Sequence, residues 1–226
     1  RAPAVHTSVM NRPHVTLKLA TSLDGRIATA AGESRWITGA QSRAEVHLMR
    51  AAADAVMIGA GTARADDPEL LARTDPPPLR QPLRVVLNSK LDLPASGRLF
   101  ATLGQAPLLL LGTESADGAV LEAAGAEVAR VKGEGGRVDV ASALTRLAQR
   151  GAATVLVEGG GQLAASLILA GLVDRLGWFR APVVLGEEGR AGIGALQVMR
   201  MADAPAWRRI AVKPLGPDLW ESYERA

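Results

Sequence analysis

Residues 155–174, VLVEGGGQLAASLILAGLVD, contain the pattern that decides the fold. A run of β-branched and aliphatic residues ends at an acid, Glu158; three glycines follow, and then an Ala/Leu-rich segment with helical spacing. This order predicts a buried strand that passes through a glycine turn directly into a helix, the basic unit of α/β proteins. Glycines alone often serve only a tight turn. The acid favours a binding site, because ligands of open α/β sheets lie beyond the carboxyl ends of the strands.

The rest of the chain alternates the same two kinds of segment. Apolar runs predict strands at residues 14–20, 83–88, 106–112 and 127–131, and strands followed by turns within 54–62, 153–161 and 174–186. Helical spacing predicts helices at residues 38–53 (capped by Thr38), 118–125, 138–151 and 162–171, and a loop or short helix at 65–73 with Pro68 at an early helical position. Residues 206–224 read as an antiparallel hairpin around PLGPD. We therefore predict a three-layer α/β fold with a mainly parallel central sheet and an antiparallel C-terminal hairpin at its edge.

The composition narrows the classes of function. Hydrophobic residues make up 48% of the 226 residues, charged residues 22% and aromatic residues 3%, which fits a globular core but offers little stacking surface for single-stranded nucleic acid. The formal charge of +3 comes with no dense basic run. Cys is absent, so thiol catalysis is excluded, and no apolar stretch reaches about 18 residues. We expect a cytoplasmic protein with a tag or linker at 1–11 and one domain at 12–226, without nucleic-acid or membrane partners.

Three strand ends carry candidate ligand-binding residues. At the first, Glu158 faces the expected crevice, and the amide groups that open the next helix make an anion site. The second, IGAGTARADDP at 58–68, offers Thr62 to a phosphate or ribose, and Asp66 and Asp67 to a ribose or a metal, although paired loop acids are more commonly solvated. The third, LNSK, offers Ser89 and Lys90 to a 2′-phosphate. These interpretations stay open at this point, because the glycine turn lacks the G-x-G-x-x-G spacing of a Rossmann start.

Other side chains have both a structural and a functional interpretation. The long polar segment 21–39 has the length of a functional loop, while its Trp36 also suits a plug at the core edge. Arg50 and Arg73 suit solvated helix and loop positions, or a pair that binds a phosphomonoester. No histidine has ligand spacing, so we expect no metal site. A G-x-S-x-G elbow is absent, so hydrolase chemistry has no support, and no Walker A pattern is present.

Five blocks together resemble a known family. They are RPHVTLKLATSLDGRIA (12–28), GESRWIT (32–38), GAGTARADDPELLAR (59–73), RVVLNSKLDLP (84–94) and VEGGGQLAASLILAGLVD (157–174). In this order they resemble the reductase domain of the bacterial bifunctional riboflavin-biosynthesis deaminase/reductases, over nearly the whole chain from about Arg12 to Tyr223. That family has a dihydrofolate-reductase-like fold.

The resemblance implies a reaction and its residues. The reaction is NADPH-dependent reduction of 5-amino-6-(5-phosphoribosylamino)uracil, in which hydride reaches C1′ of an imine formed by the ring-opened sugar. Lys18 and Glu158 are the implied catalytic residues that orient or protonate the imine. The implied substrate-binding residues are Ser34, Arg50, Leu70, Arg73 and Glu158. The implied cofactor-binding residues are Ala20, Trp36, Thr62, Asp66, Ser89, Gly160, Gly161, Gln162, Leu163, Ala164, Ala165 and Ser166.

Two departures from the family pattern limit what the resemblance implies. Family members are often fused to a zinc deaminase with a Cys-containing signature, which this Cys-free chain lacks. We therefore expect either a domain cut from a longer protein or a stand-alone reductase with a separate deaminase as partner. Asn88 stands where an Asp is expected, beside Ser89. The family also implies a homodimer. Two alternatives remain: a related NADPH reductase of another pterin- or pyrimidine-like compound, and a catalytically silent nucleotide-binding module.

Overall fold

The computed structural model describes residues 12–34 and 37–226. The expected tag or linker at residues 1–11 and the expected cofactor contact Trp36 lie outside the described residues. Within the described part, no helix is long and apolar enough to cross a membrane.

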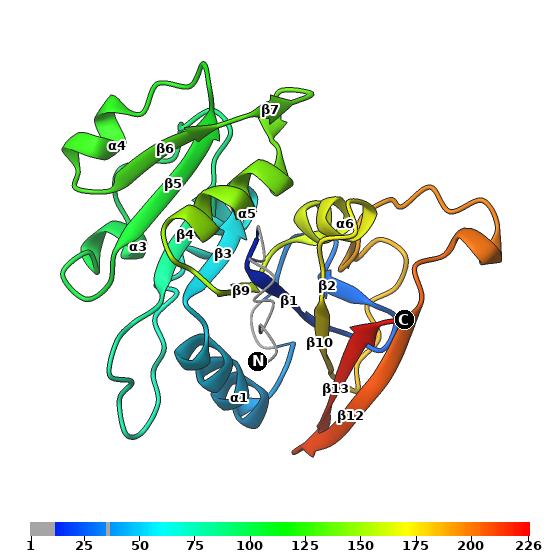
Figure 1. The fold of residues 1–226 in the computed structure, drawn as a ribbon. Coiled ribbons are helices and arrows are strands. Elements are labelled where there is room, and N and C mark those ends of the chain that lie inside the picture. Colours follow the sequence, from blue (N-terminus) through cyan, green and yellow to red (C-terminus); the bar gives the residue numbers. More distant parts are fainter. Residues whose placement is uncertain (1–11, 35–36) are drawn as a thin grey trace, which may run out of the picture.

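A nine-stranded sheet runs through the molecule in the order β12-β13-β10-β1-β9-β3-β4-β5-β6 (Figure 1). The strands from β10 to β6 in this order are parallel, and β13 and β12 form an antiparallel hairpin at the β10 edge. The strands of the sheet are β1 (His14–Thr21), β3 (Ala55–Gly59), β4 (Leu83–Leu87), β5 (Leu108–Thr113), β6 (Glu127–Val131), β9 (Thr154–Val157), β10 (Arg175–Arg180), β12 (Trp207–Leu215) and β13 (Asp218–Arg225). The predicted parallel sheet with a hairpin edge is confirmed.

Two small antiparallel pairs lie outside the main sheet. One joins β2 (Arg26–Ala28) to β11 (Arg190–Ala191), and the other joins β7 (Gly133–Glu134) to β8 (Arg137–Val138). The first pair ties the long segment after β1 to a segment far along the chain, so a region that sequence periodicity left without structure is partly ordered by pairing.

Helices cover both faces of the sheet and complete the three layers. They are α1 (Ala40–Ala52), α2 (Ala60–Asp66), α3 (Arg98–Ala101), α4 (Ala119–Ala123), α5 (Val140–Gln149) and α6 (Gly161–Leu169), with a short 3-10 helix η1 (Met201–Asp203). Helices α5 and α6 lie on one face, while α1, α3 and α4 lie on the other (Figure 1).

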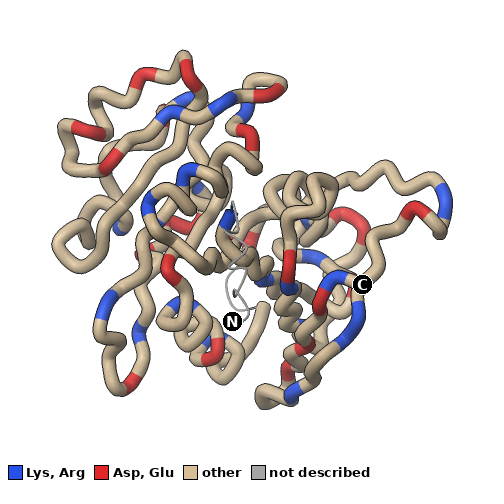
Figure 2. The backbone as a smooth tube through the Cα atoms, in the orientation of Figure 1, with Lys and Arg blue, Asp and Glu red and all other residues tan. Residues whose placement is uncertain are grey.

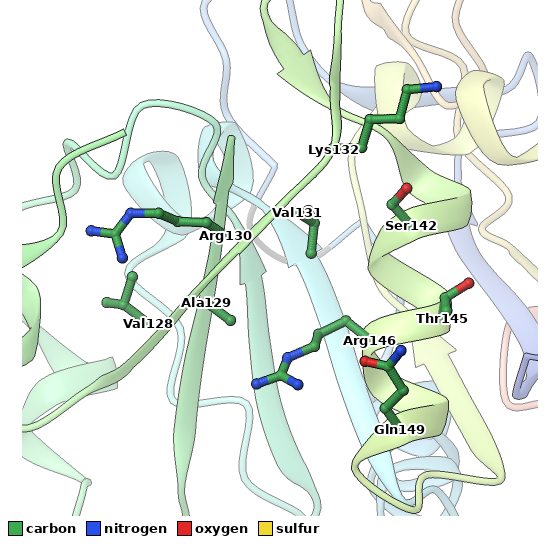
Figure 3. Close-up of a pocket in the computed structure, with 9 residues that line it drawn as sticks. All are labelled: Val128, Ala129, Arg130, Val131, Lys132, Ser142, Thr145, Arg146 and Gln149. Carbon is green, nitrogen blue, oxygen red and sulfur yellow. The ribbon is translucent and has the colours of Figure 1, made fainter. Parts of the chain in front are cut away.

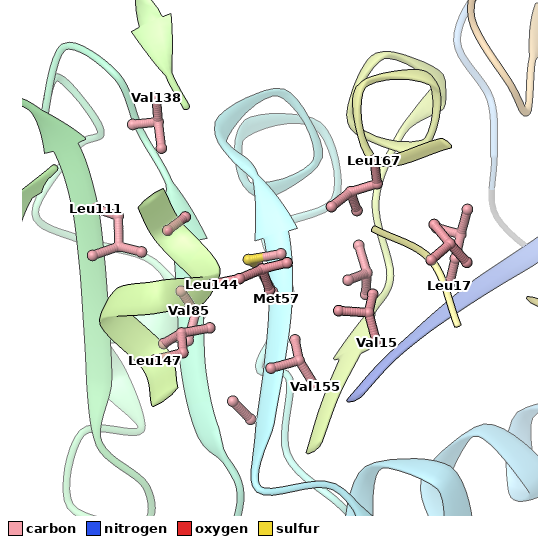
Figure 4. Packing of buried hydrophobic residues seen from close by; sticks show 14 of the residues in the cluster. Val15, Leu17, Met57, Val85, Leu111, Val138, Leu144, Leu147, Val155 and Leu167 are labelled. Carbon is pink, nitrogen blue, oxygen red and sulfur yellow. The ribbon is translucent and has the colours of Figure 1, made fainter. Parts of the chain in front are cut away.

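Successive residues of the central strands pack alternately in two hydrophobic cores, one on each face of the sheet. Met57 of β3 packs with Leu144 and Leu147 of α5, whereas its neighbour Ile58 packs with Leu121 of α4 on the opposite face (Figure 4). Because side chains of a strand point alternately to the two faces, a strand covered on both sides must be apolar throughout. This is the physical reason why β3, β5 and β9 appear in the sequence as largely apolar runs. β4 departs from this pattern at the buried Arg84.

The start of α1 differs from the prediction. The N-cap is Gly39, not Thr38, and no side chain of its own caps the helix. Instead, Asp218 at the start of β13 accepts hydrogen bonds from the Gly39 amide (2.7 Å) and from the Ser42 hydroxyl (2.6 Å). A carboxylate supplied by a distant strand replaces the local cap, so sequence spacing around Thr38 could not reveal it.

The segment after β3 also differs from the prediction. The residues read as a glycine turn form helix α2 directly after Gly59, and the helix ends at Asp67, whose backbone is left-handed (φ 40°). Pro68 therefore follows this helix and does not open one, so its predicted early helical position is wrong. The buried Ala63 anchors α2 against the core, which outweighs the low helix propensity of Gly and Thr.

Candidate active site

A cleft of about 1560 Å³ opens beyond the carboxyl ends of four neighbouring parallel strands. Its walls include the second half of β1, the turn after β3 that enters α2, the residues after β4, and the glycine turn between β9 and α6. This is the position that topology predicts for a ligand in an open α/β sheet.

A buried charged cluster forms the floor of the cleft. Arg50 of α1 donates two hydrogen bonds to Glu158, from Nε to Oε1 (2.5 Å) and from Nη2 to Oε2 (2.9 Å). Lys18 Nζ lies 3.7 Å from Glu158 Oε2. Lys18 faces α1 because it alternates with Leu17 and Leu19, which enter the core on the α5–α6 side. The cluster thus joins three elements that are far apart in the chain.

The electrostatics fix the charge of each group in the cluster. Burial alone would raise the pKa of Glu158, but the positive charges of Arg50 and Lys18 outweigh it and lower the pKa to about 2. The pKa of Lys18 is lowered, chiefly by burial and further by Arg50, while Glu158 opposes the shift. At neutral pH, Glu158 is therefore an anion with no proton to give. The Lys18 ammonium releases its proton more readily than an exposed lysine does, because its pKa is lowered.

The glycine turn brings the backbone of α6 to the cleft wall. Gly160 is the N-cap of α6, and a Cβ on Gly161 would lie 2.5 Å from the Ala191 carbonyl oxygen. A side chain at Gly161 would therefore displace the segment that carries β11. The free amide groups at the start of α6 point a partial positive charge towards the cleft, where an anionic group gains from it.

Other predicted site residues lie around this turn. The Thr62 hydroxyl of α2 is the nearest atom, at 3.6 Å, to a Cβ built on Gly160. At the end of the same helix, Asp66 accepts a hydrogen bond from the Ser34 hydroxyl (3.1 Å), which links α2 to the loop after β2. Ser89, after β4, accepts a hydrogen bond from the Val138 amide of β8 (3.0 Å), so this strand end is held by the β7–β8 pair.

The structure therefore brings most of the predicted residues together at one cleft. Those that line it are Lys18, Ala20, Ser34, Arg50, Thr62, Asp66, Leu70, Ser89, Glu158, Gly160, Gly161, Gln162, Leu163 and Ser166. Ala164 and Ala165 are buried on the core side of α6 and are not among the lining residues. Arg73 is also outside the lining; its guanidinium is 60% exposed and pairs with Glu69 (2.5 Å).

Sequence reasoning missed lining residues that come from distant loops. Arg137 of β8 and Arg190 of β11 both line the cleft. Neither stands in a motif, and both reach the site only through the two short strand pairs, so no local signal could have identified them. Figure 2 shows that basic and acidic residues are interspersed along the described chain, so charge clustering gave no signal either.

A second, smaller hollow of about 440 Å³ lies between the edge strand β6 and helix α5 (Figure 3). Arg130, Lys132 and Arg146 are its charged residues, and no predicted site residue lies in it. Charged residues on an edge strand are a common protection against unwanted strand pairing, which is a sufficient reason for them here. Among the described residues, no group of three or more His, Asp or Glu side chains could hold a metal ion.

Comparison with known proteins assigns the family. The model of the RibD C-terminal domain matches residues 13–220, which is nearly the whole chain. The chain belongs to the RibD C-terminal domain family. The resemblance noted in the sequence is thereby confirmed.

The chain matches a part of each of three individual relatives. The riboflavin biosynthesis protein RibD of Haemophilus influenzae is 36% identical over 223 residues, which cover 93% of this chain and 58% of that protein. The solved RibD of Acinetobacter baumannii superposes with a TM-score of 0.85 at 29% identity, covering 96% of this chain and 59% of that one. The solved Thermotoga maritima protein described as a diaminohydroxyphosphoribosylaminopyrimidine deaminase/5-amino-6-(5-phosphoribosylamino)uracil reductase gives 0.79 at 28% identity, covering 95% and 57%. The chain thus spans somewhat more than half the length of these relatives.

A more distant match concerns the fold alone. The dihydrofolate reductase of Enterococcus faecalis, solved with NADP(H), superposes with a TM-score of 0.51 at 16% identity, covering 94% of this chain and 96% of that one. The dihydrofolate-reductase-like fold implied by the resemblance is confirmed.

Proposed function

We propose that the chain reduces 5-amino-6-(5-phosphoribosylamino)uracil to its ribitylamino product, with NADPH as the hydride source, in riboflavin biosynthesis. The observation that carries the proposal is the buried Lys18–Glu158–Arg50 cluster at the cleft of a RibD C-terminal domain. The Thermotoga maritima relative is named for this reduction. That name also covers a deaminase, and the chain spans 57% of that protein, so a deaminase, on the same chain or on a separate one, is the proposed source of the substrate.

The residues of the cleft fit a nicotinamide dinucleotide. The start of α6, where Gly161 leaves no room for a side chain, offers free amide groups to a phosphate. Ala20, Thr62, Asp66, Ser89, Gly160, Gly161, Gln162, Leu163 and Ser166, which all line the cleft, are the proposed contacts. Ser89 is assigned to the 2′-phosphate that distinguishes NADPH. Bound there, the cofactor would supply the hydride that reduces C1′.

Lys18 and Glu158 divide the remaining chemistry. Glu158 is ionised and held by Arg50, so it suits hydrogen bonds from the hydroxyl or N–H groups of the substrate. Lys18 is the group of the pair that carries a transferable proton, and its lowered pKa favours donation to the imine as the hydride arrives. We therefore assign Lys18 as the proton donor and Glu158 as the residue that positions the substrate.

Arg73 is the main residue assigned to bind the substrate phosphate. All three guanidinium nitrogens of Arg50 have partners, two interactions with Glu158 and one with the Leu71 carbonyl oxygen, so Arg50 orients Glu158. Arg73 is mostly exposed near Leu70, which lines the cleft, and it can exchange Glu69 for a phosphate. Ser34 and Leu70 are the other proposed substrate contacts.

The test is NADPH oxidation by the pure protein, with the substrate generated by a separate deaminase. We expect turnover that depends on this substrate, and in Arg73→Ala a KM raised about tenfold or more with kcat nearly unchanged. Arg200→Ala is the matched control, since Arg200 is exposed and paired with Asp203 within a single turn, far from the cleft residues. Tight NADPH binding without turnover would refute the substrate, and absent NADPH binding would favour a silent module.

The family resemblance also leads us to propose a cytoplasmic homodimer. Sedimentation equilibrium of the purified protein tests this state, and a monomer at micromolar concentration would contradict it.

A further inference from the structure

The segment Glu69–Arg73 has an unusual backbone at the cleft wall. Leu70, which lines the cleft, has a left-handed backbone with φ 56° although it carries a large side chain, and that side chain is 2% exposed. A non-glycine residue in this region costs about 1–2 kcal/mol, so its surroundings must hold it there. Strain of this kind is typical of segments whose position matters for a ligand.

Side chains from other elements bind the backbone on both sides of Leu70. On the amino-terminal side, the buried Arg84 of β4 donates to the Glu69 carbonyl oxygen (3.2 Å). On the carboxyl-terminal side, Arg50 donates to the Leu71 carbonyl oxygen (3.1 Å). These two arginines have further partners, so neither is dedicated to the segment.

Both hydrogen bonds of the Gln81 side chain go to the Glu69–Arg73 segment. Its Oε1 accepts from the Ala72 amide (2.7 Å) and its Nε2 donates to the Ala72 carbonyl oxygen (2.8 Å). The side-chain amide thus satisfies both backbone groups of Ala72, as a neighbouring strand would. The proline-rich connection at 75–82 therefore has a structural consequence, because it returns the chain so that Gln81 reaches a residue nine positions earlier.

His47 binds the next residue. Its Nδ1 accepts a hydrogen bond from the Arg73 amide (3.1 Å), which requires that Nδ1 carry no proton. Burial lowers the pKa of His47, and the charges of Arg50 on its own helix and Arg73 on the facing segment lower it further. The Leu71 backbone and, to a smaller extent, Glu158 act in the opposite direction. His47 is not among the residues that line the cleft, and its hydrogen bond to the Arg73 amide connects it to the segment that carries Leu70.

We propose that Gln81 and His47 are positioning residues that hold the Glu69–Arg73 segment in the conformation that receives the substrate phosphate. This inference rests on the proposed function, since it assumes that Arg73 binds the phosphate. Gln81 fixes Ala72 and His47 fixes Arg73, so the guanidinium of Arg73 starts from a defined backbone position three residues after Leu70, which lines the cleft.

The experiment compares Gln81→Leu, His47→Leu and His47→Asn with the wild type, with Gln149→Leu on the exposed side of α5 as the control for a glutamine-to-leucine change. An Asn side chain can place its amide oxygen near the position of Nδ1, so it retains the acceptor without titrating. Two quantities are measured: the KM and kcat of the reductase reaction, and hydrogen exchange of the peptide that covers residues 70–74. The Kd for NADPH and the thermal midpoint are measured alongside them.

We expect both Leu variants to raise KM about tenfold with kcat within about twofold, and to speed exchange of the 70–74 amides about tenfold or more. His47→Asn should restore both quantities, and the Kd for NADPH should not change. In an Arg73→Ala background, His47→Leu should add little to KM, because the two changes remove the same interaction.

Several outcomes would overturn the proposal. Faster exchange without a change in KM would limit both residues to a structural role, and equal impairment of His47→Asn and His47→Leu would show that the acceptor is irrelevant. Should a Leu variant fail to fold, Gln81→Glu, which keeps the acceptor and loses the donor, must still show an intermediate KM. Absent turnover by the wild type would instead refute the proposed function, and with it the role of Gln81 and His47 in substrate binding.

Discussion

Replacing Glu158 by Gln tests the energetic account of the cleft most directly. Glu158 is 9% exposed and is held between Arg50 and Lys18. Burial favours the neutral acid, but the two cations overcome this and lower the pKa from 4.5 to about 2. Each unit of pKa difference between the folded and unfolded states corresponds to about 1.36 kcal/mol. The lowered pKa of Glu158 therefore means that its carboxylate stabilises the folded state by about 3 kcal/mol at neutral pH. Glu158→Gln removes that contribution and leaves Arg50 and Lys18 without their anion.

The measurement is thermal and urea unfolding of the wild type and the variant at pH 7. For a domain of this size, about 3 kcal/mol corresponds to a thermal midpoint lowered by about 6–12 °C. Since the pKa is depressed in the folded state, the contribution is complete above pH 4.5 and is lost as the pH falls towards 2. The difference in the free energy of unfolding between wild type and Glu158→Gln should therefore be constant near neutral pH and should decrease in acid. Glu187→Gln, an exposed acid, is the control.

One result would refute this reasoning. Suppose that the free energy of unfolding of Glu158→Gln lay within about 1 kcal/mol of the wild-type value at pH 7. The cost of desolvating the charged cluster would then offset the attraction between Glu158 and the two cations, as it does for many buried ion pairs. A difference that did not decrease in acid would show that the loss comes from packing and not from charge.

Three further substitutions probe other parts of the structure. Lys18→Met should lower kcat by about a hundredfold or more while the Kd for NADPH stays the same, because a proton donor is lost; an unchanged kcat in stopped-flow assays would exclude Lys18 from that role. Gly161→Ala should weaken NADPH binding and lower the thermal midpoint, because its Cβ meets the Ala191 carbonyl oxygen at 2.5 Å, whereas Gly61→Ala meets nothing within 4 Å and should fold normally in the same calorimetric scan. Asp139→Ala should cost about 1 kcal/mol in urea unfolding, because Asp139 caps α5 by accepting from the Ser142 amide at 2.9 Å; an unchanged midpoint would contradict this.

The strands of the sheet could be predicted because their two-sided burial dictates their composition. β5 and β9 are apolar at every position that faces a core, so their existence follows from the sequence alone. The glycine turn and Glu158 were also predictable, since both follow such a run. Helix α2 was missed because its sequence, AGTARAD, has weak local preference and depends on the packing of Ala63.

The support around the site could not be predicted, because it consists of contacts between distant residues. Asp218 caps α1 from the last strand, and Arg84 lies fully buried with its guanidinium on carbonyl and hydroxyl oxygens rather than on an acid. A buried arginine inside an apolar run looks in sequence like the polar face of an edge strand. His47 and Gln81 likewise carry no motif, and only the folded chain shows what they bind.

The central place of β1 determines when the cleft can exist. His14 pairs with Thr154 of β9, and Thr16 pairs with Arg175 of β10, so β1 has no neighbour in the main sheet until most of the chain has been made. By contrast, β3, β4 and β5 each pair with the next strand of the main sheet in sequence, so β3 to β6 can assemble during synthesis. Lys18 meets Glu158 only when β1 is inserted beside β9, which closes a long loop of the chain at an entropic cost. A nascent or truncated chain can therefore hold a well-formed half sheet and still have no catalytic centre.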